Sequence, residues 1–144
     1  NECAYILLQG METNRLKKMK EETFDNIISD LQSKYVIHES NHEDYKSIRI
    51  MCKDGSSFAR ACIYHNDPSC ICLSDLYVQD DFRNKGEGKY LQEVRENIGI
   101  SLGCDTALLS VKKNSWMFEW YERRGYEYYM DDIDNYLFMT KKLN

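Results

Sequence analysis

Apolar residues recur at helical spacing in the first part of the chain, with charged and polar residues between them. Such spacing is typical of a helix that packs one face against a core. It predicts helical structure from residue 12 to residue 33, with a break near residues 22 and 23 that would make two short helices. The apolar positions of this pattern are Met19, Phe24, Ile27, Ile28 and Leu31.

The pattern changes near residue 35, where alternating and β-branched residues replace the helical spacing. Short segments of this kind are typical of strands, and the polar turns between them favour antiparallel pairing. The segment CICLSDLYV (70–78) is apolar enough to predict a central strand that is buried on both faces. The other strands are expected in YVIHES (35–40), YKSIRIMCK (45–53) and SFARACIYH (57–65).

A helix is expected to start near Gly86–Gly88, and from residue 91 onward its apolar residues fall on one helical face. Gly103 is placed to end this helix. The segment TALLSV (106–111) has the composition of a short strand, so residues 71–79 and 106–111 should pair in parallel through a right-handed crossover. The apolar face of the helix consists of Leu91, Val94, Ile98 and Leu102.

The last elements predicted are a helix and a hairpin. SWMFEWYERR (115–124) has Ser115 near its N-cap and Gly125 just beyond its end, and a hairpin would follow around the acidic segment DDID (131–134). Together the elements predict a mixed α/β (α+β) fold on one sheet, whose strands change from antiparallel to parallel near its middle. Ligands tend to bind where such a sheet parts, at the carboxyl ends of its strands.

The composition narrows the class of protein. The 144 residues are 42% hydrophobic and 30% charged and contain no linker or repeat, which indicates a single domain over residues 1–144. The net charge of −5 argues against nucleic acid as a partner and suits a cationic substrate. No apolar stretch approaches the about 20 residues that span a membrane, so we expect no membrane partner.

The beginning of the chain leaves two interpretations open. The segment LLQG stands directly before Met11, so residues 1–10 could be foreign to a protein that starts at Met11. Alternatively, CAYILLQ (3–9) is a first strand of the fold.

The six cysteines favour a reduced cytoplasmic protein. Cys70 and Cys72 are separated by one residue in an apolar run, which points both side chains to the same face of a strand. No Cys-x-x-Cys pair or Cys/His spacing typical of a zinc site occurs, so we expect no metal. The sequence shows no signal peptide, and a chain of this size does not require disulfides.

The segment DDFRNKGEGKYL (80–91) places two glycines between the central strand and the helix that follows it. Glycines let a backbone approach a ligand closely, and the free N–H groups of a helix N-terminus attract anions. Arg83, Lys85 and Lys89 add positive charge. The spacing is neither that of a nucleotide P-loop nor that of a dinucleotide fingerprint. From the residues alone, an anion-binding loop and a solvated helix cap remain alternatives.

Two motifs resemble those of the GNAT-type N-acetyltransferase superfamily. Arg83-Asn84-Lys85-Gly86-Glu87-Gly88 matches Q/R-x-x-G-x-G/A, the loop that holds the pyrophosphate of acetyl-coenzyme A (acetyl-CoA). NSWMFEWYERRGY (114–126) is similar to the family's N-x-x-A-x-x-x-Y-x-x-x-G-F/Y helix. The order of elements agrees over roughly residues 45–142, with the N-terminal helices as a variable lid on the substrate side.

The resemblance implies both a fold and a cosubstrate site. In the GNAT fold, antiparallel N-terminal strands splay from a parallel strand pair, and helices lie on both faces of the mixed sheet. Acetyl-CoA would lie in the gap, with its pantetheine arm against the end of the central strand and its pyrophosphate on residues 84–89. The cofactor-binding residues implied are Leu76, Tyr77, Val78, Arg83, Asn84, Lys85, Gly86, Glu87, Gly88, Lys89, Asn114, Ser115, Trp116, Met117 and Tyr121.

The resemblance also implies direct transfer of an acetyl group to a primary amine. Tyr121 would protonate the departing thiolate, since a phenol is protonated at neutral pH. Asp75 is the best-placed base or amine anchor, although a structural role remains open for it. The stretches LSDLYV and WYERRG are similar to those of the spermidine/spermine and diamine acetyltransferase subgroup. There a glutamate precedes the aspartate, but here Ser74 does, so water chains from Asp75, Glu119 or Glu122 stay open as the base.

Three functions are compatible with these residues. The first is acetylation of a polyamine or another small amine. The second is acetylation of a protein lysine or N-terminal amine, and the third is a module that binds coenzyme A without catalysis. Members of the family often dimerise, so a homodimer is compatible with the resemblance as well.

Overall fold

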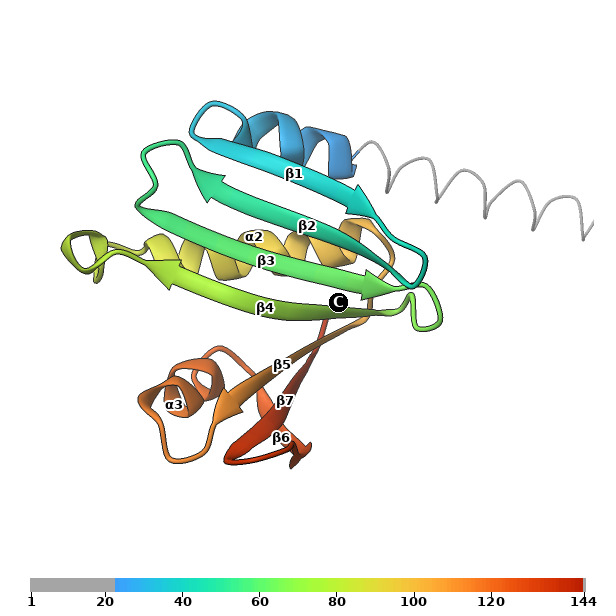
Figure 1. Ribbon diagram of the computed structural model, residues 1–144, viewed down its shortest axis with the longest axis vertical. Helices are drawn as coiled ribbons and strands as arrows, with labels where there is room; N and C mark the ends of the chain where they lie inside the picture. Colours follow the sequence, from blue (N-terminus) through green and yellow to red (C-terminus); the bar gives the residue numbers. More distant parts are fainter. Residues whose placement is uncertain (1–22, 144) are drawn as a thin grey trace, which may run out of the picture.

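The computed structural model describes residues 23–143, and four antiparallel strands form the first half of its sheet (Figure 1). Residues 23–31 are helical, and the rest of the helix expected from residue 12, like the segment CAYILLQ, lies outside the described residues. The strands pair in the order in which they occur. They are β1 (Tyr35–Asn41), β2 (Tyr45–Cys52), β3 (Ser57–Tyr64) and β4 (Cys70–Val78).

The second half of the sheet is reached through a helix. The short 3-10 turn η1 (Asp80–Phe82) and helix α2 (Glu87–Ser101) lead from β4 to β5 (Thr106–Lys112), which pairs with β4 in parallel as the sequence predicted. Helix α3 (Trp116–Glu122), β6 (Glu127–Asp131) and β7 (Tyr136–Lys142) follow. The strand order β1-β2-β3-β4-β5-β7-β6 gives a mixed seven-stranded sheet with one parallel pair, which is the expected GNAT fold.

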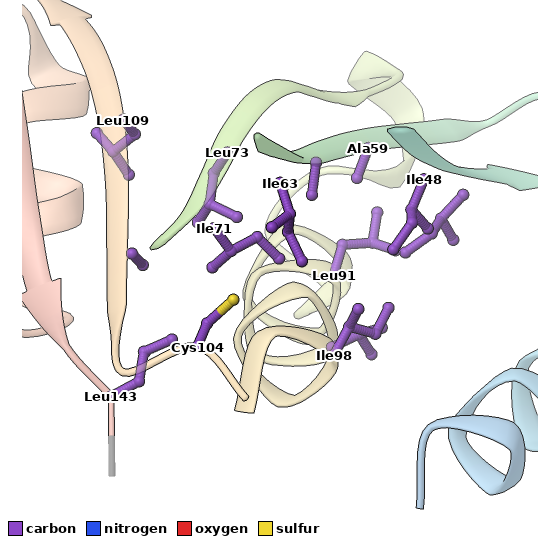
Figure 2. Close-up of a cluster of buried hydrophobic side chains, with 14 of the residues drawn as sticks. Ile48, Ala59, Ile63, Ile71, Leu73, Leu91, Ile98, Cys104, Leu109 and Leu143 are labelled. Atoms are coloured by element: carbon purple, nitrogen blue, oxygen red, sulfur yellow. The ribbon is translucent and has the colours of Figure 1, made fainter. Parts of the chain in front are cut away.

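The core lies between one face of the sheet and α2. Figure 2 shows Leu91 of α2 pointing toward Ile48 of β2, in one cluster with Ile71 of β4 and Ile98 of α2, and each of these four is at most 1% exposed. Alternation therefore decides which strand residues are buried, because successive side chains in a strand point to opposite faces. Burial of such side chains supplies the main driving force for folding.

Close packing of α2 on β4 depends on a glycine. A Cβ atom built at Gly99 would lie 2.8 Å from Cγ2 of Ile71, so a larger residue would push the helix away from the strand. At the end of the helix Gly103 has φ of 93°, the left-handed conformation that commonly ends helices. These two glycines fix how close α2 lies to the sheet and where it ends.

One expectation about the faces of the sheet is corrected by the packing. Strand β4 was expected to be buried on both faces, but Ile71 and Leu73 face the core whereas Cys72 and Ser74 are partly exposed. Residues 23–31 and α2 lie on the same face of the sheet, as Figure 2 shows. None of the described helices is long and apolar enough to cross a bilayer.

Candidate active site

Strands β4 and β5 separate after four paired positions. Their register runs from Cys70↔Thr106 to Leu73↔Leu109, whereas β4 continues to Val78 and β5 to Lys112. Figure 1 shows the two strands diverging toward their carboxyl ends. The end of β4 keeps its pairing with β3 on one edge, so the backbone groups of its other edge are free of β5 and can bind an extended ligand.

The parting of the strands begins next to a bulge in β4. Ala59 pairs with Leu76 but Arg60 pairs with Ser74, which leaves Asp75 as the extra residue. Its φ of 40° is uncommon for a residue other than glycine. A bulge of this kind bends its strand and re-aims the side chains around it.

The bulge changes the expected environment of Asp75. The sequence placed this carboxylate inside an apolar strand, but its side chain is 55% exposed. Its Oδ2 lies 3.5 Å from Nε of Arg60, and the same Nε donates a hydrogen bond of 3.1 Å to the Ser74 hydroxyl. Asp75 is therefore an accessible carboxylate with one cationic partner, which is a suitable arrangement for exchange with a cationic ligand.

The glycine loop forms the N-terminus of α2, as the sequence predicted. Gly86 is the N-cap and has φ of 85°, a left-handed conformation that favours glycine. The first bond of the helical type runs from the Tyr90 N–H to the Gly86 carbonyl at 2.9 Å. The N–H groups of residues 87–89 have no acceptor within the helix, so they can bind an anion at its positive end.

The space next to Gly88 is narrow. A Cβ atom built there would lie 3.8 Å from Cζ2 of Trp120 and 3.9 Å from Cγ2 of Val78, which are ordinary van der Waals distances. Gly88 thus lies where the end of β4, the start of α2 and helix α3 meet.

The charged side chains of the loop have different orientations. Arg83 donates from Nε to the Val78 carbonyl at 2.8 Å and forms an ion pair of 2.8 Å with Asp80, so it braces the loop. Lys85 lies over the ring of Phe82, 5.6 Å from its centroid. Asn84 has φ of 62°, and Lys89 lines a nearby cavity. Of the three cations expected around an anion, Arg83 is thus already committed to the loop itself.

Glu87 points away from the free N–H groups. Its carboxylate accepts hydrogen bonds from the hydroxyls of Tyr35 and Ser57, and Lys34 lies 3.3 Å away. Burial acts to raise the pKa of Glu87, but these hydrogen bonds and the charge of Lys34 together hold the pKa below its usual value. Only the backbone of Glu87 is left for a ligand, and its side chain anchors the first turn of α2 to β1 and β3.

The second motif lies on the far side of the gap. Asn114 is exposed with φ of 56°, and Ser115 is the N-cap of α3. The Ser115 hydroxyl donates to the Lys112 carbonyl at 2.7 Å and makes no capping bond to the helix. Trp116 is 69% exposed, and Met117 packs partly against the core.

Tyr121 is buried between other aromatic rings. It is 5% exposed, and its ring meets those of Trp120 and Tyr126 edge to face, with centroids 4.9 and 5.5 Å away. Its hydroxyl interacts with the guanidinium of Arg95 in α2. Arg95 also contacts the carbonyl of Asp75 at 3.5 Å, so the two expected catalytic residues share one neighbour.

Arg95 is the residue of this region that the sequence analysis missed. A signal for it exists, because position 95 lies four residues after Leu91 and three before Ile98, on the apolar face of α2. A charged residue on that face is buried only with specific partners. The predicted face omitted Arg95 because residues were selected by hydrophobicity.

A second feature that the sequence analysis missed is a cavity of about 280 Å³ beside α2. Its walls come from α2, the end of α3 and β7, and not from β4 or β5. Four cationic and two acidic side chains line it, so an anionic group would find an excess of positive charge there. The lining residues are Lys89, Gln92, Glu93, Glu96, Arg123, Arg124 and Lys141.

Comparison with protein families identifies one match. The model of the acetyltransferase (GNAT) family matches residues 13–126, which include both motifs. No curated protein matches the chain. Within residues 23–143 no group of three His, Cys, Asp or Glu side chains could hold a metal ion.

Solved structures of the same fold come from several organisms. A Klebsiella pneumoniae chain described as an acyl-CoA N-acyltransferase has a TM-score of 0.60 at 14% identity, over 76% of this chain and 98% of that one. The PaiA N-acetyltransferase of Thermoplasma acidophilum, solved in complex with coenzyme A, has a TM-score of 0.57 at 23% identity, over 69% of this chain and 61% of that one. The ribosomal-protein-S18-alanine N-acetyltransferase of Escherichia coli has a TM-score of 0.55 at 19% identity, over 72% of each chain.

Proposed function

Because the chain belongs to the acetyltransferase (GNAT) family, we propose that it transfers the acetyl group of acetyl-CoA directly to a primary amine. One observation carries the proposal. The end of β4 parts from β5 after the pair Leu73↔Leu109, and the last residue of β4, Val78, lies beside Gly88 at the N-terminus of α2, 3.9 Å from a Cβ atom built there. A cosubstrate with a long amide-bearing arm and a pyrophosphate needs these two features side by side.

The residues fit acetyl-CoA in three places. The free N–H groups of residues 87–89 would bind the pyrophosphate, and Gly88 has no Cβ atom that would hinder its approach. The backbone of Leu76–Val78 would pair with the amides of the pantetheine arm, opposite Asn114 and Ser115. The cationic cavity with Lys89, Arg123 and Arg124 would receive a further phosphate of the cosubstrate.

The transfer needs an electrophile, a base and an acid. The amine nitrogen forms a bond to the thioester carbonyl carbon while the carbon–sulfur bond breaks. A backbone N–H of residue 77 or 78 would stabilise the negative charge on the carbonyl oxygen. The amine would lose its proton to Asp75, directly or through water, and the thiolate would take a proton from the Tyr121 hydroxyl.

A small cationic amine is the acceptor that we favour. The exposed Asp75 carboxylate stands next to the bulge, and its partner Arg60 can be replaced by another cation. The net charge of −5 would attract polyamines and diamines over a longer range. We therefore favour a small cationic amine over a lysine or an N-terminal amine of a protein as the acceptor.

An acetyl-CoA consumption assay across a panel of amines tests the function. The panel contains polyamines, diamines, lysine, a lysine peptide and peptides with free N-termini, and release of free thiol is the readout. We expect turnover with at least one polyamine or diamine. Turnover with the peptides alone would favour a protein substrate. Binding of coenzyme A by calorimetry with no turnover of any amine would favour a binding module.

A further inference from the structure

A charged side chain lies in the core of this protein, in the middle of α2. Arg95 is 1% exposed, although burying an arginine is costly unless its donors find acceptors. Burial, the largest effect, lowers the pKa of Arg95 below its ordinary value, and Tyr121, Tyr126 and Glu96 act in the opposite direction. Because this burial is costly, the groups that accept the hydrogen bonds of Arg95 indicate what the residue does.

The acceptors of Arg95 are backbone carbonyls at the bulge. One terminal nitrogen donates to the carbonyls of Ser74 at 2.8 Å and Arg60 at 3.1 Å, and that of Asp75 lies at 3.5 Å. Asp75 has no partner on β3, and Arg60 and Ser74 form the register pair directly beside it. Arg95 therefore donates hydrogen bonds to the backbone at the irregularity, and these bonds stabilise it.

The same guanidinium also reaches α3. It interacts with the Tyr121 hydroxyl, and its other terminal nitrogen donates to the Gln92 side chain at 2.5 Å. Beyond Gln92 the bonds continue to Tyr126 and Glu96. Arg95 therefore connects the β4 bulge on one side of the gap with the tyrosine of α3 on the other.

We propose that Arg95 is a positioning residue that fixes the bulged end of β4 and the Tyr121 hydroxyl relative to each other. The inference rests on the proposed function, because these are the groups assigned to the thioester carbonyl and to the departing thiolate. A residue that holds both at once adjusts their separation across the gap. Small displacements of reacting groups reduce the rate strongly while leaving much of the binding intact.

The conservative variant Arg95→Lys tests the proposal. Lysine keeps a long side chain with a nitrogen donor, but a single nitrogen cannot serve the carbonyls, Gln92 and Tyr121 together. We expect kcat to fall about tenfold or more, with KM for acetyl-CoA and Kd for coenzyme A changed by less than about threefold. Arg95→Met should lose more activity and more thermal stability, because it leaves the bulge carbonyls without a donor.

Tyr126→Phe is the matched control. Tyr126 is 1% exposed and its hydroxyl bonds to Gln92 and Glu96, but it makes no hydrogen bond to the bulge. The Tyr126→Phe substitution should lower the melting temperature, while kcat stays near the wild-type value. Wild-type kcat in Arg95→Lys would overturn the proposal, and so would an equal loss of kcat in Tyr126→Phe at the same melting temperature.

Hydrogen exchange separates this inference from the proposed function. If the wild-type protein acetylates no amine, the function fails, but the positioning role still predicts faster exchange of the amides of residues 74–78 in Arg95→Lys. The amides of β2 should exchange as in the wild type, because the hydrogen bonds of Arg95 go to residues 60, 74, 75 and 92 and not to β2. Unchanged exchange at residues 74–78 would overturn the role of Arg95 whatever the activity.

Discussion

Nε of Arg60 lies 3.5 Å from Oδ2 of Asp75, so the carboxylate proposed to receive the amine already has a cationic partner. A cationic acceptor would have to displace Arg60. In Arg60→Gln we therefore expect KM for a polyamine to fall by about 2- to 5-fold, the range of an exposed ion pair, with KM for acetyl-CoA unchanged. Steady-state kinetics with both substrates varied measures this.

Arg49→Gln is the control for that variant. Arg49 is the register partner of Arg60 on β2, so its removal takes away a neighbouring charge without breaking the Asp75 ion pair. If KM for the polyamine fell equally in both variants, general charge would explain the effect. An unchanged or higher KM in Arg60→Gln would contradict a role of Asp75 in binding the amine.

Gly88→Ala tests the anion-binding loop. The added methyl group would lie at ordinary distances from Trp120 and Val78, so the fold should accept it, but it would hinder the close approach of a pyrophosphate to the N–H groups of this turn. We expect the Kd for coenzyme A to rise at least about tenfold, equivalent to about 1.4 kcal/mol, with little change in melting temperature. Calorimetric titration gives the Kd.

Gly86→Ala makes a useful contrast because the two glycines differ. Nothing lies within 4 Å of a Cβ atom at Gly86, but its φ of 85° strains any larger residue. This variant should lower the melting temperature by distorting the helix start. If Gly88→Ala bound coenzyme A like the wild type, the loop would be a plain helix cap.

Glu87→Gln tests the anchor of α2. At pH 7 the wild-type carboxylate accepts bonds from Tyr35 and Ser57, so we expect the variant to be less stable by about 1–2 kcal/mol. The pKa of Glu87 is lowered by folding, so its contribution is present above the ordinary pKa and is lost as pH falls through the folded value. Urea unfolding between pH 3 and pH 7 should show the two proteins converging at the acid end.

The exposed Glu39 on β1 provides the comparison for Glu87. Glu39→Gln should leave the free energy of unfolding nearly unchanged at every pH, because surface substitutions of this kind have small effects. A constant difference between wild type and Glu87→Gln from pH 7 to pH 3 would rule out the charge of Glu87 as the source of the stability.

The thiols of the exposed sheet face give a chemical prediction. Cys62 and Cys72 are direct register partners on β3 and β4. A hydrogen bond from Cys72, the largest effect, lowers the pKa of Cys62 to about 7, against burial and with help from the Arg60 charge. The pKa of Cys72 is raised in turn. Alkylation of Cys62 should therefore be half-maximal near pH 7 and precede that of Cys72.

Peptide mass spectrometry after iodoacetamide labelling follows each thiol separately. In Cys72→Ala the donor is lost, so the inflection for Cys62 should move up toward the ordinary value of about 8.5. The buried Cys52 serves as an internal reference that reacts slowly throughout. An inflection for Cys62 that Cys72→Ala does not move would contradict the thiol–thiol hydrogen bond.

The elements of the fold could be predicted from local patterns because each strand or helix buries one face, and the spacing of its apolar residues shows which type of element has that face. The alternation in β2 and β3 marks the residues that face the core, and Gly86 and Gly103 mark the ends of α2. The motifs around Gly88 and Tyr121 also lie on the elements predicted for them. Local sequence therefore carries the order of elements and the location of the gap.

The environment of Asp75 could not be predicted in the same way. The bulge at this residue is in contact with Arg95, which is 20 positions away on another element. The direction of Arg83 likewise depends on the Val78 carbonyl, which its own loop brings within 2.8 Å. Such choices are made by tertiary contacts, so a pattern of hydrophobic and polar residues does not encode them.

Tyr121→Phe tests the proposed acid most directly. Phenylalanine fills the same buried space among Trp120 and Tyr126, so the fold should be retained, but the hydroxyl beside Arg95 is lost. We expect kcat to fall by about 10²-fold, the usual contribution of a general acid, with KM for acetyl-CoA nearly unchanged. Tyr126→Phe removes a neighbouring buried hydroxyl and should keep its kcat. A wild-type kcat in Tyr121→Phe would assign the proton of the departing thiolate to another donor, such as water.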